Sequence, residues 1–200
     1  MGDYLSIMIR LANQLRIKRS QAIRFLSRVL NLPPRPSLIL LKFLEKRPIV
    51  AVEVGVSIGN NAQHMLSRIP QIKKLYLVDP YRYADDLKDQ HRIHGDLSKY
   101  KLTAKENLKP FKDRTVFVYE PFSSEVIPEK VDFIYIDGDH STQAVISDIE
   151  ESFKILNKNG MIAGHDIHYD SVRRGVETIF GANYHRFCYD WWVKPSLIHR

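Results

Sequence analysis

The sequence predicts an α/β fold in which helices cover a mostly parallel sheet, and three features support this prediction. Short apolar runs alternate with longer stretches of helical periodicity, as expected for strands followed by crossover helices. The first run, at 49–54, breaks directly into a glycine loop and then a helix. Two later runs end in clusters of acid and histidine, which is typical of the carboxyl edge of a parallel sheet. A chain of 200 residues is long enough for one well-packed domain.

The first 36 residues are predicted to form a helical extension, and residues 37–200 the main domain. The helices predicted here share apolar residues spaced by three and four positions, and they cover 5–15, 20–30 and 38–46. Ser20 and Ser37 are the expected caps of the second and third helices. An extension of this kind can cover a site, hold a partner or form a homo-oligomer contact.

Basic residues are concentrated at the N-terminus of a chain whose formal charge is +7. In the first 28 residues a single acid, Asp3, faces six basic residues, which are Arg10, Arg16, Lys18, Arg19, Arg24 and Arg28. A basic stripe is most often a solvated helix face, but it can also bind nucleic acid or an anionic membrane surface.

The run at 49–54 suits a strand buried on both faces, because it is rich in β-branched residues without polar alternation. The loop that follows has the pattern E-x-G-x-x-x-G, formed by Glu53, Gly55 and Gly59. It lacks the G-x-G-x-x-G pattern that brings a helix N-terminus against a pyrophosphate. An acid at this position disfavours a phosphate and favours a cationic ligand.

A second strand, over 75–78, ends at Asp79, which lies 24 positions after Gly55. This spacing is close to the roughly 20 residues expected before an acid that binds ribose hydroxyls. The alternative is an Asp-Pro turn. In the long polar segment at 81–97, His91 and His94 are better read as surface histidines than as metal ligands. A helix over 98–108 and a strand over 115–119 are predicted to follow.

The central strand, 133–136, is predicted to stop at a cluster of Asp137, Asp139 and His140. Ser141 is expected to cap a helix that runs to Asn159-Gly160. The next strand, 161–163, ends in Gly-His-Asp, so His165 and Asp166 should lie beside Asp137 on the same edge. A helix over 170–180 and two strands around 186–189 and 191–194 should complete the domain, with Trp191 and Trp192 as packing residues. Two carboxylates and an imidazole at the end of a buried strand indicate chemistry rather than stability.

The segments IDGDHS and NKNGMIAGHDI resemble a subfamily of class I S-adenosylmethionine (SAM) dependent methyltransferases that carries IDGDHSY and PGGxIxGHDY. The resemblance runs from about Ser37 to the end of the chain. It implies a Rossmann-like, mostly parallel seven-stranded sheet with an antiparallel last strand. The four residues at 157–160 replace the usual Pro-Gly-Gly, which should change a turn and not the site.

The resemblance also implies which residues bind the cofactor. The glycine loop, with Glu53, Gly55, Ser57 and Gly59, should hold the methionine part of SAM. Asp79 should bind the ribose, and Asp137 should also lie at the cofactor. The segment around Phe122 and Ser123 should lie near the adenine.

Related metal-dependent O-methyltransferases bind Mg²⁺ at the ends of the fourth and fifth strands. Carried over by position, the metal ligands are Asp137, His165 and Asp166, with Asp139 as general base. An imidazole ligand suits Mn²⁺, Fe²⁺ or Zn²⁺ better than Mg²⁺. Alternatively, His140 or His165 acts directly as the base without a metal.

The sequence therefore predicts a SAM-dependent O-methyltransferase that acts on a small molecule or a sugar. The alternatives are an RNA methyltransferase that uses the basic helices, an NAD-type oxidoreductase, and a SAM-binding partner protein without turnover. We expect a cytoplasmic protein, because Cys188 is the single cysteine and the N-terminus does not resemble a signal peptide. No apolar run is long enough to span a bilayer.

Overall fold

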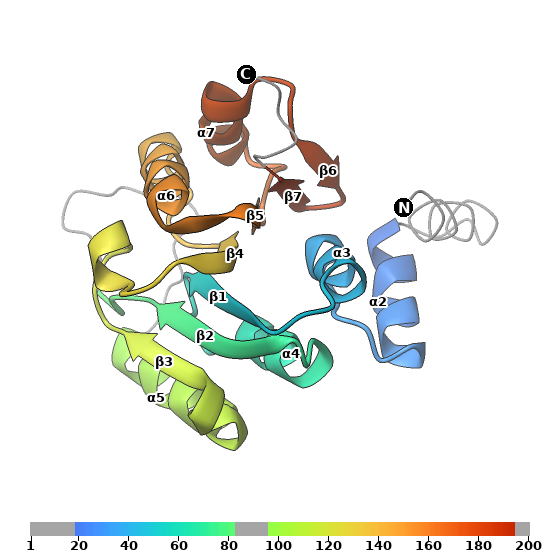
Figure 1. The fold of residues 1–200 in the computed structure, drawn as a ribbon, viewed down its shortest axis with the longest axis vertical. Helices are drawn as coiled ribbons and strands as arrows, with labels where there is room; N and C mark the ends of the chain where they lie inside the picture. The colour runs from blue at the N-terminus through green and yellow to red at the C-terminus, as the bar shows by residue number, and fades with distance from the viewer. Residues whose placement is uncertain (1–18, 83–95, 195–200) are drawn as a thin grey trace.

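The computed structural model describes residues 19–82 and 96–194, and within them seven strands form one sheet (Figure 1). The strands are β1 (Ile49–Val54), β2 (Ile72–Val78), β3 (Thr115–Val118), β4 (Val131–Ile136), β5 (Leu156–Gly164), β6 (His185–Phe187) and β7 (Asp190–Val193). Their order across the sheet is β3-β2-β1-β4-β5-β7-β6. The first five strands are parallel, and β7 pairs antiparallel with both β5 and β6. This confirms the predicted Rossmann-like fold with an antiparallel last strand.

Helices cover both faces of the sheet, and two apolar clusters join the layers (Figure 1). The described helices are α2 (Arg19–Val29), α3 (Pro36–Leu44), α4 (Asn60–Arg68), α5 (Leu97–Leu108), α6 (Thr142–Ile155) and α7 (Asp170–Phe180), with 3₁₀ turns η1 (Lys109–Arg114) and η2 (Ser124–Val126). Residues of α2, α3, α4 and α5 pack on one face, and residues of α6 and α7 pack on the other. Alternate residues of the inner strands contribute to the two clusters, as expected for strands that are buried on both faces. No helix in the described part of the chain is long and apolar enough to cross a membrane.

Two predicted helix caps are wrong. Helix α2 includes both Arg19 and Ser20, so Ser20 is not its N-cap residue. Helix α3 begins at Pro36, whose fixed φ suits the first helical position, and Arg35 is its N-cap residue. Ser37 is therefore free for a tertiary contact, and both its backbone N–H and its hydroxyl donate to Asp190 of β7.

The predicted end of the helix after Ser141 is also wrong, although Ser141 is its cap. Helix α6 ends at Ile155, and Asn159-Gly160 lies inside β5. The Asn157 side chain donates to Asp132 of β4 over 2.7 Å, and the pairing of β4 with β5 shifts register near Val131. The helix thus ends before the local signal at Asn159-Gly160, and this dipeptide lies in the irregular part of β5.

Other predictions lie close to the observed elements or outside the described residues. The helix predicted over 170–180 coincides with α7, and both tryptophans of β7 are buried as expected for packing residues. The helix predicted over 5–15 lies outside the described residues, as do His91 and His94.

The contact between Ser37 and Asp190 joins α3 to the edge of the sheet, and we expect it to stabilise the fold. Asp190 is buried, so Ser37→Ala would leave its carboxylate short of a donor. We predict that Ser37→Ala lowers the free energy of unfolding by about 1–3 kcal/mol in urea denaturation. The matched control, Ser67→Ala on the exposed side of α4, should change it by less than about 0.5 kcal/mol. Equal effects of the two variants would contradict the prediction.

Candidate functional site

The carboxyl ends of β1, β4 and β5 meet at one edge of the sheet. Backbone hydrogen bonds extend the strand pairing past the last strand residues, from Asp137 N–H to Val54 O and from His165 N–H to Ile136 O. This pairing fixes where the first residues of each loop begin. The clusters that follow β4 and β5 are therefore held side by side, as the sequence predicted.

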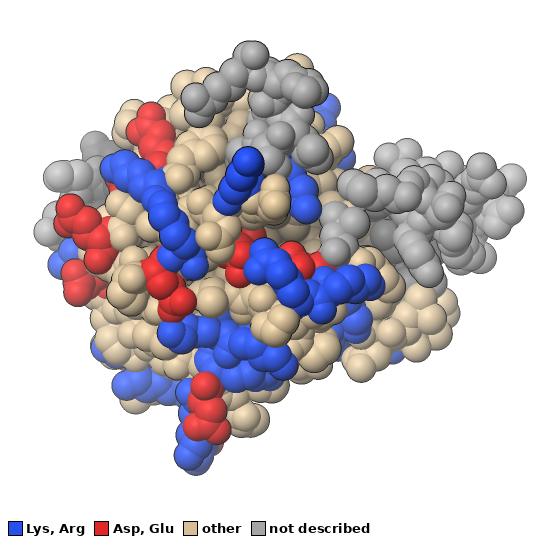
Figure 2. Space-filling model, in the orientation of Figure 1, with Lys and Arg blue, Asp and Glu red and all other residues tan. Residues whose placement is uncertain are grey.

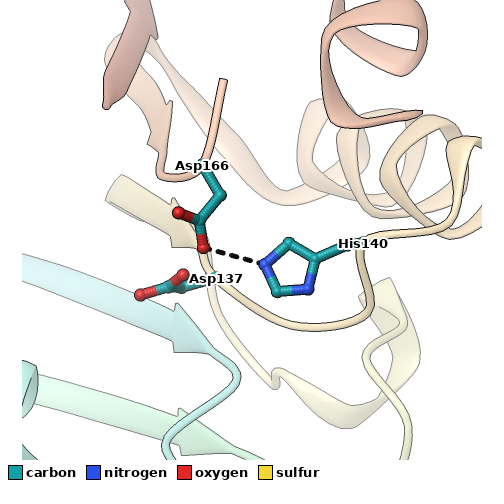
Figure 3. Close-up of side chains that lie close together, drawn as sticks. All are labelled: Asp137, His140 and Asp166. Atoms are coloured by element: carbon teal, nitrogen blue, oxygen red, sulfur yellow. Dashed lines mark hydrogen bonds and ion pairs between the residues drawn. The ribbon is translucent and has the colours of Figure 1, made fainter. Parts of the chain in front are cut away.

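Asp166 is the centre of an acid and histidine cluster (Figure 3). Its Oδ2 lies 2.9 Å from Nε2 of His140, and its Oδ1 lies 2.9 Å from Nδ1 of His165. The same nitrogen of His165 lies 3.7 Å from Oδ1 of Asp137. Asp166 adopts a φ of 57°, a left-handed conformation that is uncommon outside glycine. One carboxylate thus orients two imidazoles.

The cluster can also hold a divalent cation. Asp137, His140 and Asp166 each offer one ligand atom, and these atoms lie within 4.8 Å of one another. The set predicted from the sequence, Asp137, His165 and Asp166, shares two of these residues. The structure offers His140 in addition, because the loop after β4 turns its ring toward Asp166 (Figure 3).

The pKa values of the two carboxyl groups in this cluster are shifted in opposite directions. Burial raises the pKa of Asp137, although Arg35 and His165 oppose the shift. Burial would also raise the pKa of Asp166, but hydrogen bonds with His140 and His165 outweigh it and hold that pKa well below its ordinary value. Asp166 is therefore held in its ionised form at neutral pH.

Arg35 enters this cluster from the segment before α3, and the sequence analysis did not identify it. Its Nη2 lies 3.3 Å from Oδ2 of Asp137, and its guanidinium lies 5.9 Å from the ring centroid of Tyr135. Prolines on both sides, Pro34 and Pro36, limit the backbone that carries it. The Pro-Arg-Pro sequence before a predicted helix was the one available signal. Arg35 supplies a fixed positive charge next to the acids.

Asp190 is a second residue that the sequence analysis missed. It is almost fully buried, and it accepts hydrogen bonds from Ser37 and, over 3.2 Å, from the hydroxyl of Tyr135. Burial raises the pKa of Asp190, against the opposing effects of Arg35 and Ser37. Its Oδ1 lies 4.0 Å from Nε2 of His165. Asp190 therefore joins the floor of the site to the N-terminal helices.

Asp79 shapes the glycine loop. Its Oδ2 accepts hydrogen bonds from the N–H groups of Val56 and Ser57 over 2.9 and 3.0 Å, and its Oδ1 accepts one from Tyr81 over 2.8 Å. Gly55 has a φ of +83°, and an added Cβ would lie 2.2 Å from the carbonyl oxygen of Asp137. The loop is therefore packed against the end of β4, and a side chain at this position would force the strands apart.

Glu53 has one carboxylate oxygen without a partner. Its Oε1 accepts a hydrogen bond from Asn61 over 2.9 Å, whereas the buried Oε2 has no hydrogen-bond partner among the described residues. Burial raises the pKa of Glu53 to about 8, and the hydrogen bond from Asn61 only partly opposes this shift. A buried acceptor without a partner destabilises the folded state unless it is protonated or accepts a hydrogen bond from a ligand.

The remaining predicted residues lie in three places. Gly59, with a φ of 80°, is the N-cap residue of α4, and the carbonyl of Ser57 accepts a hydrogen bond from the Tyr81 hydroxyl. Asp139 accepts a hydrogen bond from Ser141 N–H over 2.7 Å, which fixes the turn into α6. The last two residues, Phe122 and Ser123, precede η2, and Phe122 packs against the core on the side of α6 and α7.

A cavity of about 550 Å³ opens beside the cluster, between the N-terminal helices and the ends of β5 and β7. Its lining includes residues of the predicted extension, of α4 and of the loop after β5, namely Ile23, Pro34, Arg35, Pro36, Asn60, Asn61, His64, His165, Asp166, His168, Tyr169, Cys188, Tyr189 and Asp190. The ring of His168 lies 4.1 Å from that of Tyr169 and 4.7 Å from that of Tyr189, so one wall is aromatic. Asp139, Phe122 and Ser123 do not line this cavity. Its volume suits a small organic ligand.

Comparison with known proteins gives one family match and one relative. Residues 52–167 match a family model described as a methyltransferase domain. A protein of Acanthamoeba polyphaga mimivirus, described as uncharacterized, is 29% identical over 134 residues. That alignment covers 64% of this chain and 55% of the viral protein, so the chain spans about half the length of this relative.

Several solved structures share the fold at low sequence identity. A calicheamicin methyltransferase gives a TM-score of 0.58 at 14% identity, covering 97% of this chain and 93% of that one. An rRNA methylase from Streptococcus thermophilus gives 0.55 at 14% identity, covering 79% and 93%. A SAM-dependent O-methyltransferase from Thermotoga maritima gives 0.52 at 14% identity, covering 83% and 51%. At these identities the likeness establishes the fold alone.

The raised pKa of Glu53 gives a testable dependence of stability on pH. The ordinary pKa of this carboxyl is 4.5 and the folded value is about 8, so between these pH values the folded state binds more protons than the unfolded state. The stability contributed by Glu53 is therefore present at low pH and falls as pH rises, by up to about 1.4 kcal/mol per pH unit. We predict that Glu53→Gln removes this slope in urea denaturation between pH 5 and pH 8. Parallel profiles for wild type and variant would contradict the assignment.

Proposed function

Since the chain belongs to the methyltransferase domain family, we propose that it transfers a methyl group from SAM to a hydroxyl group of a small molecule or a sugar. The observation that carries this proposal is the position of His165, which lines the cavity and is oriented by the ionised Asp166. A base held in this way beside a ligand cavity is what deprotonation of a hydroxyl requires. Membership of this family argues against an NAD-type oxidoreductase, which was one of the alternatives that the sequence left open.

The residues at the carboxyl end of β1 fit the proposed cofactor. SAM carries an ammonium and a sulfonium, and when bound it supplies the electrophilic methyl group. The unpartnered Oε2 of Glu53 is a buried acceptor suited to a cationic donor. Asp79 accepts hydrogen bonds from two backbone N–H groups of the glycine loop, and Gly55 allows that loop to approach the end of β4. We assign Glu53 and the glycine loop to the methionine part and Asp79 to the ribose.

His165 is our candidate general base. Its Nδ1 faces Asp166, which leaves Nε2 as the nitrogen that accepts a proton from the acceptor hydroxyl. Bound SAM would supply the methyl group and leave as a neutral thioether when its sulfur–methyl bond breaks. His165 would take the hydroxyl proton on Nε2, and Asp166 would stabilise the imidazolium. Asp139 is less suited to this role, because its carboxylate is engaged by the start of α6 and does not line the cavity. His140 is likewise directed at Asp166 rather than at the cavity.

A divalent cation bound by Asp137, His140 and Asp166 is the alternative way to activate the hydroxyl. Such an ion would lower the hydroxyl pKa and hold the oxygen in place. The mixed set of one imidazole and two carboxylates favours Mn²⁺ or Zn²⁺ over Mg²⁺. In that case the three residues act as ligands, and His165 still borders the acceptor.

RNA is the second candidate acceptor, and the basic residues of the N-terminal segment favour it. The cavity supports the smaller acceptor, because its aromatic wall and buried acids suit a neutral organic ligand rather than a phosphate backbone. Transfer of a labelled methyl group from SAM to a panel of sugars and phenols, compared with transfer to RNA, distinguishes the two. Labelling of RNA alone would replace the small-molecule proposal.

If His165 is the base, its loss should impair turnover and leave the cofactor site intact. We predict that His165→Ala lowers the rate of methyl transfer by about 10²–10⁴-fold, the usual contribution of a general base. Calorimetry should show SAM affinity close to that of wild type. His185→Ala, on the exposed strand β6, is the matched control and should retain the wild-type rate. A His165→Ala protein with normal turnover would exclude this role.

Measurements of metal binding can distinguish the two candidate sets of ligand residues. If Asp137, His140 and Asp166 bind a cation, calorimetric titration with Mn²⁺ should show that His140→Ala weakens binding by roughly tenfold or more. His165→Ala should have a much smaller effect. The reverse result would favour the set predicted from the sequence. Absence of Mn²⁺ binding to wild type, with turnover unchanged in chelator, would remove the metal from the mechanism.

A further inference from the structure

The N-terminal 44 residues hold the whole net charge of the chain. Eight of the 30 basic residues and one of the 23 acids lie there, so this stretch carries +7, and the other 22 basic and 22 acidic residues cancel. Residues 4–44 contain no acid at all. Charge asymmetry of this kind is typical of a surface that meets an anionic partner. Arg35 is one of these basic residues, and its guanidinium contacts the acidic edge described above.

Helix α2 has a second apolar face that points away from the core. Its inner face is buried through Ile23 and Ser27. On the other side, Phe25 is 60% exposed and Val29 is 64% exposed, one helical turn further along. Leu30, 57% exposed, follows directly. Three of the eight exposed large hydrophobic side chains of the described residues therefore lie within six positions.

Basic side chains border this apolar face. Arg28 is exposed in the last turn of α2. Lys42 of α3 donates to the carbonyl oxygen of Asn31, which places its charge beside the turn after Leu30. Where grey atoms do not cover it, the edge of the molecule at α2 shows mostly tan surface with some blue (Figure 2). Apolar side chains beside Lys and Arg, without acids, form the pattern of a helix that lies in a membrane interface.

We infer that the outer face of α2 and the turn that follows it, formed by Phe25, Arg28, Val29 and Leu30, docks this protein on an anionic phospholipid surface. The apolar side chains enter the boundary between headgroups and acyl chains, and the basic residues stay at the level of the lipid phosphates. Burial of apolar side chains and attraction to anionic headgroups each contribute weakly to membrane affinity. Because both contributions are weak, binding is reversible and peripheral. A nucleic acid would use the charge but would leave the aliphatic side chains in water, which favours lipid as the partner.

The test is flotation of the full-length chain with vesicles. Wild type should float with vesicles of phosphatidylcholine and phosphatidylglycerol and not with vesicles of phosphatidylcholine alone. Raising the salt concentration to about 0.5 M should weaken the association, because exposed charges are then screened beyond a few ångströms. A wild type that floats with neither preparation would overturn the inference.

Matched variants separate the apolar and the charged contributions. Phe25→Ser with Val29→Ser should lower vesicle affinity by roughly tenfold or more. The control, Leu102→Ser with Val116→Ser, removes two exposed apolar side chains from α5 and β3 and should bind as wild type. Arg28→Glu should lower the affinity by roughly tenfold, whereas Lys109→Glu in η1 should have little effect. All four proteins should unfold thermally near the wild-type temperature, since the changed side chains are exposed.

Three other results would overturn the inference. Vesicle binding that is unchanged by the Phe25 and Val29 substitutions would show that this face does not enter lipid. Salt-sensitive binding of RNA without any binding to vesicles would identify nucleic acid as the partner. A dimer that dissociates in the same double variant, again without vesicle binding, would show that a second copy of the chain covers this face.

Discussion

The site depends on how four carboxyl groups are held close together at one edge of the sheet. A different set of neighbours offsets the burial of each: Asn61 for Glu53, Arg35 with His165 for Asp137, two imidazoles for Asp166, and Arg35 with the hydroxyls of Ser37 and Tyr135 for Asp190. Because the partners differ, the four groups do not share one protonation behaviour. The pKa of Glu53, Asp137 and Asp190 is raised by burial, and that of Asp166 is lowered. This difference in environment leaves Asp166 as the dedicated anion of the site.

The N-terminal segment completes this edge instead of standing apart from it. Ser37 holds the start of α3 to Asp190, and this contact delivers Arg35 to Asp137. The prolines around Arg35 reduce the backbone freedom that fixing its guanidinium would otherwise cost. Ile23 of α2 then contributes to the wall of the cavity. A boundary drawn at residue 36 describes the order of elements along the chain, but it divides residues that work together.

The sequence was sufficient where local pattern and tertiary demand agree. Periodicity and capping chemistry predict the buried strands, the Ser141 cap and the helix at 170–180. The carboxyl ends of parallel strands must then meet at one edge of the sheet. The sequence was insufficient where contacts with residues far away in the chain determine the local structure. Asn159-Gly160 has the chemistry of a helix end, but it lies inside β5, at the place where the pairing with β4 shifts register between Leu156 and Met161. Arg35 and Asp190 lie far apart in sequence from the residues they contact, so no local spacing could reveal them.

The same chain separates two electrostatic tasks. The glycine loop uses its backbone N–H groups to bind the carboxylate of Asp79, so those donors are not free to cradle a phosphate. Together with the unpartnered oxygen of Glu53, this favours the proposed cationic ligand over a phosphate at the strand ends. The positive charge that an anionic partner would require lies instead in the N-terminal segment, and Arg35 is the member of that segment that reaches the acids. The cationic and anionic partners proposed here would thus meet different groups of side chains, and among the described residues Arg35 joins the two groups through its ion pair with Asp137.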